Sequence, residues 1–470
     1  MMYNRSYPGV QRRECWVGPE RVMAMRRKTA LTLILIAAAV LVTLIILAPV
    51  LFNVDRYRTE VISYLQEKTG KPVEIGRLTL TVFPSPSIRV DDFALKNPAG
   101  FPSGYFVKAR RIDATLGAGA LLHRQVVIKS LKLNDAVINL VSDPDEGWNF
   151  ENSTPSKTSE KVSPGGSHAS FWGVISEVEI EGGQLVASYL LPSGKPGVII
   201  LEAHNVSSKL EQVDLGAFMD PSSSSLAGQG DLKADSVRFV SIQGTNVKSK
   251  LRLMAKQVFF ADGSLEAYGG RGAGDLSFNL AGRDASFSAN AQMNGVDVAH
   301  LLAAFPQGRG KLTGKMDGTM KLAGEIEHSH DPLARIHGAG RVAIRNGQAP
   351  SLKHNANVMK LARFNNLGPA AQNPDSFSSI SADLEVANQR ISSRQINIVG
   401  YGVNAQCSGS LKVTGAGSVD YQGVAEIIAK QGFFTNSLAK LYGATSKNHR
   451  LSFPFRVSGT IDDPKFSVAH

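Results

Sequence analysis

Residues 311–322 read Lys-Leu-Thr-Gly-Lys-Met-Asp-Gly-Thr-Met-Lys-Leu, and this stretch decides the fold class. Apolar or small residues occupy every even position, and polar residues occupy every odd one. Successive side chains of a strand point to opposite faces, so the alternation predicts a half-buried β-strand with one wet face.

The same alternation recurs along most of the chain, at residues 77–83, around 276–280 and at 335–345. Helical spacing is confined to Asn53–Thr69, Val298–Phe305, Asn357–Leu367 and Val424–Tyr442. Short strands with regular turns and few helices predict a mainly β fold built on an antiparallel sheet.

Ala30–Phe52 is a run of 23 residues without a charge, preceded by Arg26-Arg27-Lys28. As a helix it is long enough to cross a bilayer core of roughly 30 Å. The basic flank predicts a cytoplasmic N-terminus and a body on the other side of the membrane. A cleaved signal peptide is the alternative, but the run is longer than the usual apolar region of such peptides. Translation from Met25 would also give a complete N-terminus.

Composition and motifs argue against several classes of function. Of the net charge of +11, +5 lies in residues 1–28 and +6 is spread over the rest of the chain, without a basic stripe interleaved with aromatics, so no nucleic acid partner is expected. Cys15 and Cys407 would lie on opposite sides of the membrane, which leaves no disulfide framework. The only His cluster, at residues 328–331, has weak metal-ligand spacing and is interpreted as a solvated turn. No catalytic, metal or cofactor site is predicted, and the protein is not expected to be an enzyme.

Two blocks of sequence carry a family resemblance. The first contains Phe-Val-Lys-Ala-Arg-Arg-Ile-Asp-Ala-Thr-Leu from Phe106 and ends with Gly-Trp-Asn-Phe at residues 147–150. It resembles the N-terminal region of the AsmA family of Gram-negative inner-membrane proteins. The second runs from Asp262 through residues 335–347 to Val-Ser-Gly-Thr-Ile-Asp-Asp-Pro-Lys-Phe at 457–466, and is similar to the C-terminal region of that family.

The resemblance implies an elongated periplasmic β-sheet curved into a taco-like apolar groove, related to chorein-type lipid-transfer bridges, with a few short helices at its ends. It implies a role in phospholipid movement and outer-membrane biogenesis, with phospholipid and the inner membrane as partners. The alternative is a scaffold or regulator of outer-membrane protein assembly, with assembly factors as partners. The lipid, the direction of transfer and the oligomeric state are left open.

Exposed apolar area is unfavourable by about 25 cal/mol per Å², so one apolar sheet face needs a cover. Acyl chains in a groove would supply it, with glycines such as Gly338 and Gly340 leaving room for them. Two sheets packed as a sandwich are the alternative, with glycines serving twist and bulges. The candidate groove residues are Leu78, Leu80, Val82, Leu276, Phe278, Leu280, Leu312, Met316, Met320, Leu322, Ile336, Val342 and Ile344.

The chain is accordingly divided into six segments. They are a cytoplasmic tail (1–28), a transmembrane helix (29–52), a helix and β region (53–150), a flexible linker (151–170), a β-sheet groove region (171–350), and a C-terminal region with helices and closing strands (351–470).

Overall fold

The computed structural model describes residues 54–83, 85–119, 127–151, 174–220, 222–306, 308–350, 375–400, 403–415, 417–428, 445–447 and 450–468. The predicted transmembrane run, almost all of the predicted linker and the predicted helix at Asn357–Leu367 lie outside these residues. Within the described part, no helix is long and apolar enough to cross a membrane.

Twenty-two strands and a few short helices make up the described residues. The helices are η1 (Val54–Tyr57, a 3-10 helix), α2 (Arg58–Thr69), α4 (Leu215–Met219) and α5 (Val298–Ala303). The strands are β1 (Val73–Glu74), β2 (Arg77–Thr81), β3 (Ser87–Lys96), β4 (Tyr105–Leu116), β5 (Ile128–Asp143), β6 (Gly147–Trp148), β7 (Val174–Leu190), β8 (Pro196–Asp214), β9 (Leu226–Phe239), β10 (Ile242–Met254), β11 (Gln257–Ala267), β12 (Gly270–Asn279), β13 (Ala285–Asp297), β14 (Lys315–Ile326), β15 (His337–Gln348), β16 (Ser376–Ala387), β17 (Arg390–Gly400), β18 (Val403–Lys412), β19 (Ser418–Ile428), β20 (Thr445–Lys447), β21 (Arg450–Thr460) and β22 (Pro464–Val468).

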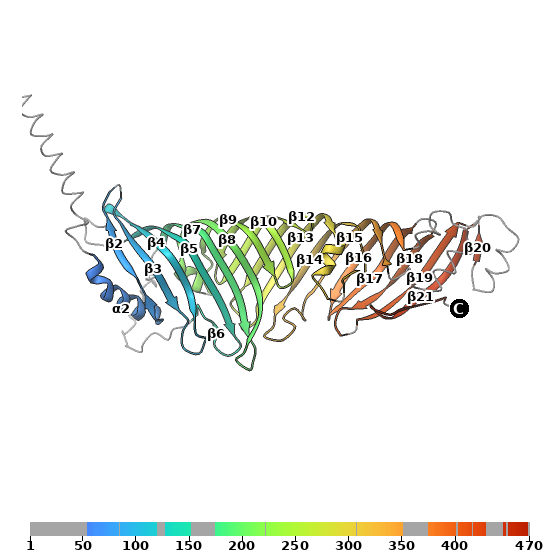
Figure 1. Cartoon of the computed structure of the whole chain (residues 1–470), viewed down its shortest axis with the longest axis horizontal. Helices are drawn as coiled ribbons and strands as arrows, with labels where there is room; N and C mark the ends of the chain where they lie inside the picture. The colour runs from blue at the N-terminus through green and yellow to red at the C-terminus, as the bar shows by residue number, and fades with distance from the viewer. Residues whose placement is uncertain are drawn as a thin grey trace, which may run out of the picture.

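All of these strands belong to one long open sheet, in which neighbours along the chain are mostly neighbours in space. Figure 1 shows β2 and α2 at one end, β20 and β21 at the other, and strands that cross the long axis obliquely. The predicted mainly β, antiparallel architecture is confirmed, with one exception. β5 and β7 pair in parallel, from Ser130 opposite Glu177 to Ser142 opposite Tyr189. Parallel neighbours need a long connection, and residues 144–173 supply it.

The helix predicted at Asn53–Thr69 is confirmed as η1 followed by α2. It ends at Gly70, whose φ of 61° is the left-handed conformation that favours glycine. Val61 and Leu65 of α2 pack against buried Val73, Ile75 and Leu78. α2 therefore covers one end of the sheet.

α5 confirms the helix predicted at Val298–Phe305, which ends two residues earlier than expected. The predicted helix at Val424–Tyr442 is wrong at its start, because Val424–Ile428 form the end of β19. This segment pairs with residues 450–454 of β21, and such ladder hydrogen bonds override a short apolar run that fits either structure. The strand predicted at residues 311–322 begins only at Lys315, since residues 311–314 belong to the turn after α5.

The two faces of the sheet differ in chemistry. One carries cross-strand ion pairs between neighbouring strands, which keep that face soluble and add little stability because they are exposed. The pairs include Arg89–Asp113, Lys132–Glu181, Lys209–Glu177, Arg341–Asp383, Arg345–Asp317 and Arg456–Asp420. We call this the outer face.

Glycines on the opposite face mark close approaches between strands. A Cβ built on Gly338 would lie 2.0 Å from the Lys321 carbonyl oxygen, and one on Gly340 would lie 2.3 Å from that of Thr319. The neighbouring backbone therefore occupies the space beside both glycines. The expectation that they leave room for cargo is wrong, and their role is to permit tight coiling of the sheet.

Candidate functional site: the apolar face of a curled sheet

The second face of the sheet is apolar from end to end. Residues directly opposite each other in antiparallel strands point to the same side, so the register identifies this face. The pairs along it include Leu78–Val90, Val90–Ile112, Ile112–Leu133, Leu251–Phe260, Phe278–Phe287, Met316–Ile344, Ile380–Ile398, Ala405–Ala425 and Val457–Phe466. One apolar face thus runs from β2 to β22, which we call the apolar face.

The predicted groove residues fall into three clusters along the chain. Leu78 joins the cluster under α2. Leu276, Phe278, Leu280, Leu322 and Ile336 join a second cluster, formed around Trp148, Tyr189, Ile200 and Phe287. Leu312, Met316, Val342 and Ile344 join a third, beside α5. Leu80, Val82 and Met320 are half-buried and lie outside these clusters.

Protein side chains cover the apolar face more completely at some strands than at others. Phe278 and Met316 are 9% and 7% exposed, so they are packed against protein side chains. Further along, Ile380, Ile396 and Ile398 are only half-buried although they lie on the same face. The apolar surface of β16–β19 therefore has only partial cover from the described residues.

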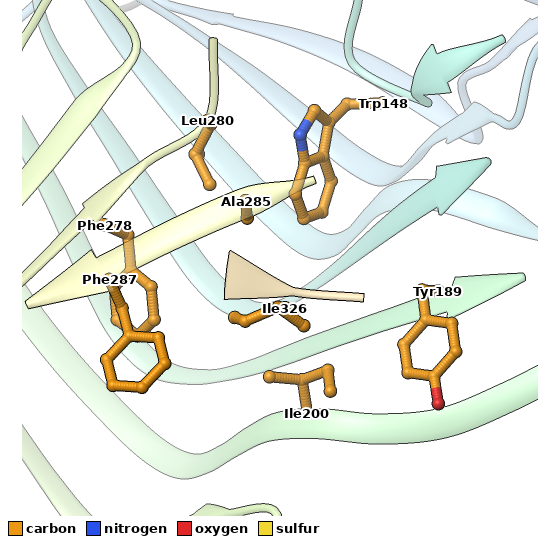
Figure 2. Close-up of a cluster of buried hydrophobic side chains, with 8 residues drawn as sticks. All are labelled: Trp148, Tyr189, Ile200, Phe278, Leu280, Ala285, Phe287 and Ile326. Atoms are coloured by element: carbon orange, nitrogen blue, oxygen red, sulfur yellow. The ribbon is translucent and has the colours of Figure 1, made fainter. Parts of the chain in front are cut away.

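The sheet has two long margins, formed by the ends of its strands, which we call its edges, and these edges meet beside the C-terminal end of β7. β7 and β14 are separated in the sheet by β8–β13 and run in opposite directions, so their C-terminal ends lie at opposite edges. Nevertheless, Tyr189 at the end of β7 donates a hydrogen bond to the Ser329 carbonyl beyond β14. Trp148, Tyr189 and Ile200 from one edge pack with Phe278 and Ile326 from the other (Figure 2). The sheet is thus curled over its apolar face.

Polar side chains join the two edges. His328 lies with Nδ1 2.8 Å from Asp284 Oδ1 and Nε2 3.0 Å from Ser142 Oγ. Its ring also makes an edge contact with Tyr189, with 5.7 Å between ring centroids. Burial raises the pKa of Tyr189, which keeps its hydroxyl a donor. We call Ser142, Tyr189, Asp284, His328 and Ser329 the clasp.

Two ion pairs also join opposite edges. Lys256 Nζ, in the turn before β11, lies 2.5 Å from Glu151 Oε1 beside the clasp, and both side chains are largely buried. Lys311 Nζ, before β14, lies 2.8 Å from Asp462 Oδ1, after β21. The curl is therefore repeated further along the sheet.

The order Ser142–His328–Asp284 matches the hydrogen-bond order of a hydrolytic triad. Ser142, however, is 3% exposed and lies inside β5, where Trp148 and Tyr189 pair with it on either side. A nucleophilic serine needs an exposed Oγ, so this arrangement fits a structural contact between edges. Within the described residues, no group of three His, Cys, Asp or Glu is placed to hold a metal ion.

A cavity of about 100 Å³ lies beneath the clasp, lined by Trp148, Tyr189, Leu185, Phe260, Phe278 and Ile326 among others. Trp148 is held in place by its neighbour Asn149, which is fully buried. Asn149 Oδ1 accepts from the Val141 amide at 3.0 Å, and its Nδ2 donates to the Asn139 carbonyl at 2.8 Å and to Asn97 Oδ1 at 2.9 Å.

The clasp was missed by reasoning from sequence. The prediction that residues 328–331 form a solvated turn is wrong for His328, whose side chain is 7% exposed. It fits His330 and Asp331, which are exposed. Ser142 and His328 are 186 residues apart. Only the curl of the sheet brings them together, and strand alternation carries no signal for it.

The N-terminal part of the chain matches a known protein family. Residues 24–185 match the model of the AsmA family. This part of the chain belongs to the AsmA family. The matched region contains α2, the strands up to most of β7, Trp148 and Asn149, and therefore part of one of the two edges that form the clasp. No curated protein and no solved structure matches the chain.

Proposed function

We propose that this AsmA family protein binds phospholipid acyl chains on its apolar face and conducts them along a groove formed by the curled sheet. In this proposal Ala30–Phe52 anchors the chain in a bacterial inner membrane, the body lies in the periplasm, and the activity supports outer-membrane lipid homeostasis. The chemistry is binding and movement of lipid, without catalysis.

The half-buried apolar face of β16–β19 carries the proposal. Ile380, Leu384, Ile398 and Leu411 all lie on it and keep part of their surface exposed. Leaving such surface in water is unfavourable by about 25 cal/mol per Å². A continuous apolar strip along a sheet suits flexible hydrocarbon chains, because they need no specific polar partner along their length. Phospholipids supply two such chains each.

The N-terminal end suits the membrane side of this proposal. Val61 and Leu65 of α2 lie on the apolar face of β1–β3, directly after the proposed anchor. An anchor at this point would hold that end of the apolar face against the membrane, where lipid is available.

The test places a photo-crosslinking amino acid on either face of one strand of the full chain in cells. Ala405 lies on the apolar face of β18 and Asn404 on the outer face. After irradiation, mass spectrometry should find phospholipid attached at position 405 and almost none at position 404. Equal labelling at both positions, or none at 405 in folded protein, contradicts the proposal.

The competing proposal is a scaffold for outer-membrane protein assembly. Its partner would be protein, bound at the outer face or at a sheet edge. Protein adducts at position 404 with no lipid at position 405 would favour it. The same pair of variants therefore separates the two functions.

A further inference from the structure

The Trp148 indole has a buried hydrogen-bond donor without an acceptor. The residue is 7% exposed, and its Nε1 has no hydrogen-bond partner. A buried N–H without a partner is unfavourable, because it has lost its hydrogen bond to water and gained none in the protein. Figure 2 shows this nitrogen on the side of the ring that faces Leu280 and Ala285, within the cluster around the cavity.

The surroundings of Nε1 restrict the ligand that could accept from it. The residues lining the cavity are mostly apolar and include no lysine and no arginine. Both ring nitrogens of His328, the lining histidine, are engaged by Asp284 and Ser142. An anionic acceptor would be left without a compensating charge, which is strongly unfavourable in an apolar site. A neutral carbonyl oxygen needs only one donor.

Position along the sheet adds a second restriction. Trp148 lies in β6, which pairs with the last residues of β5, so the indole is at the edge of the sheet. Ser142 from this edge and His328 from the opposite edge line the cavity with polar side chains, and Phe260 and Phe278 line it with aromatic rings. A ligand seated here has its polar end where the two edges meet and its apolar part against the aromatic rings.

We propose that Trp148 Nε1 donates a hydrogen bond to the ester carbonyl oxygen of an acyl chain, whose first methylene groups lie in the cavity. This rests on the proposed function, and it adds a fixed position at which the protein recognises the ester linkage rather than the hydrocarbon alone. The ester is the group of a phospholipid that joins a neutral acceptor to an apolar chain.

The experiment compares ester with ether lipids. The full chain in detergent micelles is mixed with equal amounts of diacyl and dialkyl phosphatidylethanolamine of the same chain length, and bound lipids are counted by native mass spectrometry. The dialkyl lipid lacks the carbonyl oxygens and keeps the rest of the molecule. One net hydrogen bond corresponds to a preference for the ester lipid of about 2- to 12-fold.

Trp148→Phe removes the donor and keeps an aromatic ring, so it should bind both lipids with a ratio near one. Tyr268→Phe is the matched control, because it removes a hydroxyl that accepts from the Gln243 amide outside the cavity and the clasp, and it should keep the preference. A ratio near one in the unmodified protein, as expected if a water molecule occupies Nε1, overturns this inference and leaves the proposed function standing. Binding of neither lipid contradicts the proposed function itself.

Discussion

Asn149→Ala should loosen the edge of the sheet that carries Trp148. The change deletes three side-chain hydrogen bonds, to the Val141 amide, the Asn139 carbonyl and Asn97 Oδ1. Each is worth about 1 kcal/mol net, and a buried group left without a partner adds about 1–3 kcal/mol. Since Asn149 is fully buried, solvent does not replace the lost partners. We expect local opening to become easier by about 4–6 kcal/mol.

Hydrogen exchange followed by mass spectrometry measures this directly in the full chain. The amides of Val141 and Asn149 are both bonded within this hairpin, so peptides covering residues 139–151 should exchange about 10³- to 10⁴-fold faster. Asn97→Ala removes one of the three bonds and should raise the rate only about fivefold. Equal rates in the two variants would refute the view that Asn149 is the anchor of this edge.

Three further outcomes follow from the apolar face. Gly340→Val should unfold the β14–β15 region and lower the yield of soluble full chain, because its Cβ would lie 2.3 Å from a backbone oxygen. Gly415→Val is the comparison: its backbone is strained, but its Cβ would meet no atom within 4 Å, so the loss should be smaller. Ile398→Glu should lower lipid recovered with the protein several-fold, whereas Asn397→Glu on the other face should not. Burial raises the pKa of Cys407 from 9.0 to about 11, so the folded state retains the thiol proton while the unfolded state loses it. The free energy of unfolding should therefore fall by about 2 kcal/mol as pH rises from 9 to 11, and Cys407→Ala should show a smaller decline in urea titrations.

Strand positions and faces were largely predictable, because alternation is a local property of the sequence. Met316 and Met320 lie on the apolar face, as the pattern at residues 311–322 predicts, and their partners across the ladder are apolar or small. The pattern failed where it was short. Val424 is 44% exposed on the outer face of β19, and its neighbours resemble a helix only because apolar residues lie on both sides of the strand.

The contacts of the clasp could not be predicted from strand alternation. A register specifies which residues pair with adjacent strands, but the contact between β7 and the β14–β15 turn depends on the summed twist and coiling of all the strands between them. Small changes in strand twist at individual glycines add to that sum. Gly230 and Gly274 are examples, because a Cβ at either position would meet a neighbouring backbone oxygen within 2 Å. The composition of a single strand does not determine it.

The clasp also limits how a lipid can travel under the proposed function. A headgroup that lies between the edges of the curled sheet cannot pass the point where Tyr189 meets Ser329 and Lys256 meets Glu151 while these contacts are formed. The contacts that must part are a few side-chain hydrogen bonds and one ion pair, each worth about 0.5–3 kcal/mol. Opening at that scale is compatible with microsecond-to-second motions. Conduction along the apolar face would then proceed in steps, with lipid waiting on the Trp148 side until the clasp opens towards β16–β19.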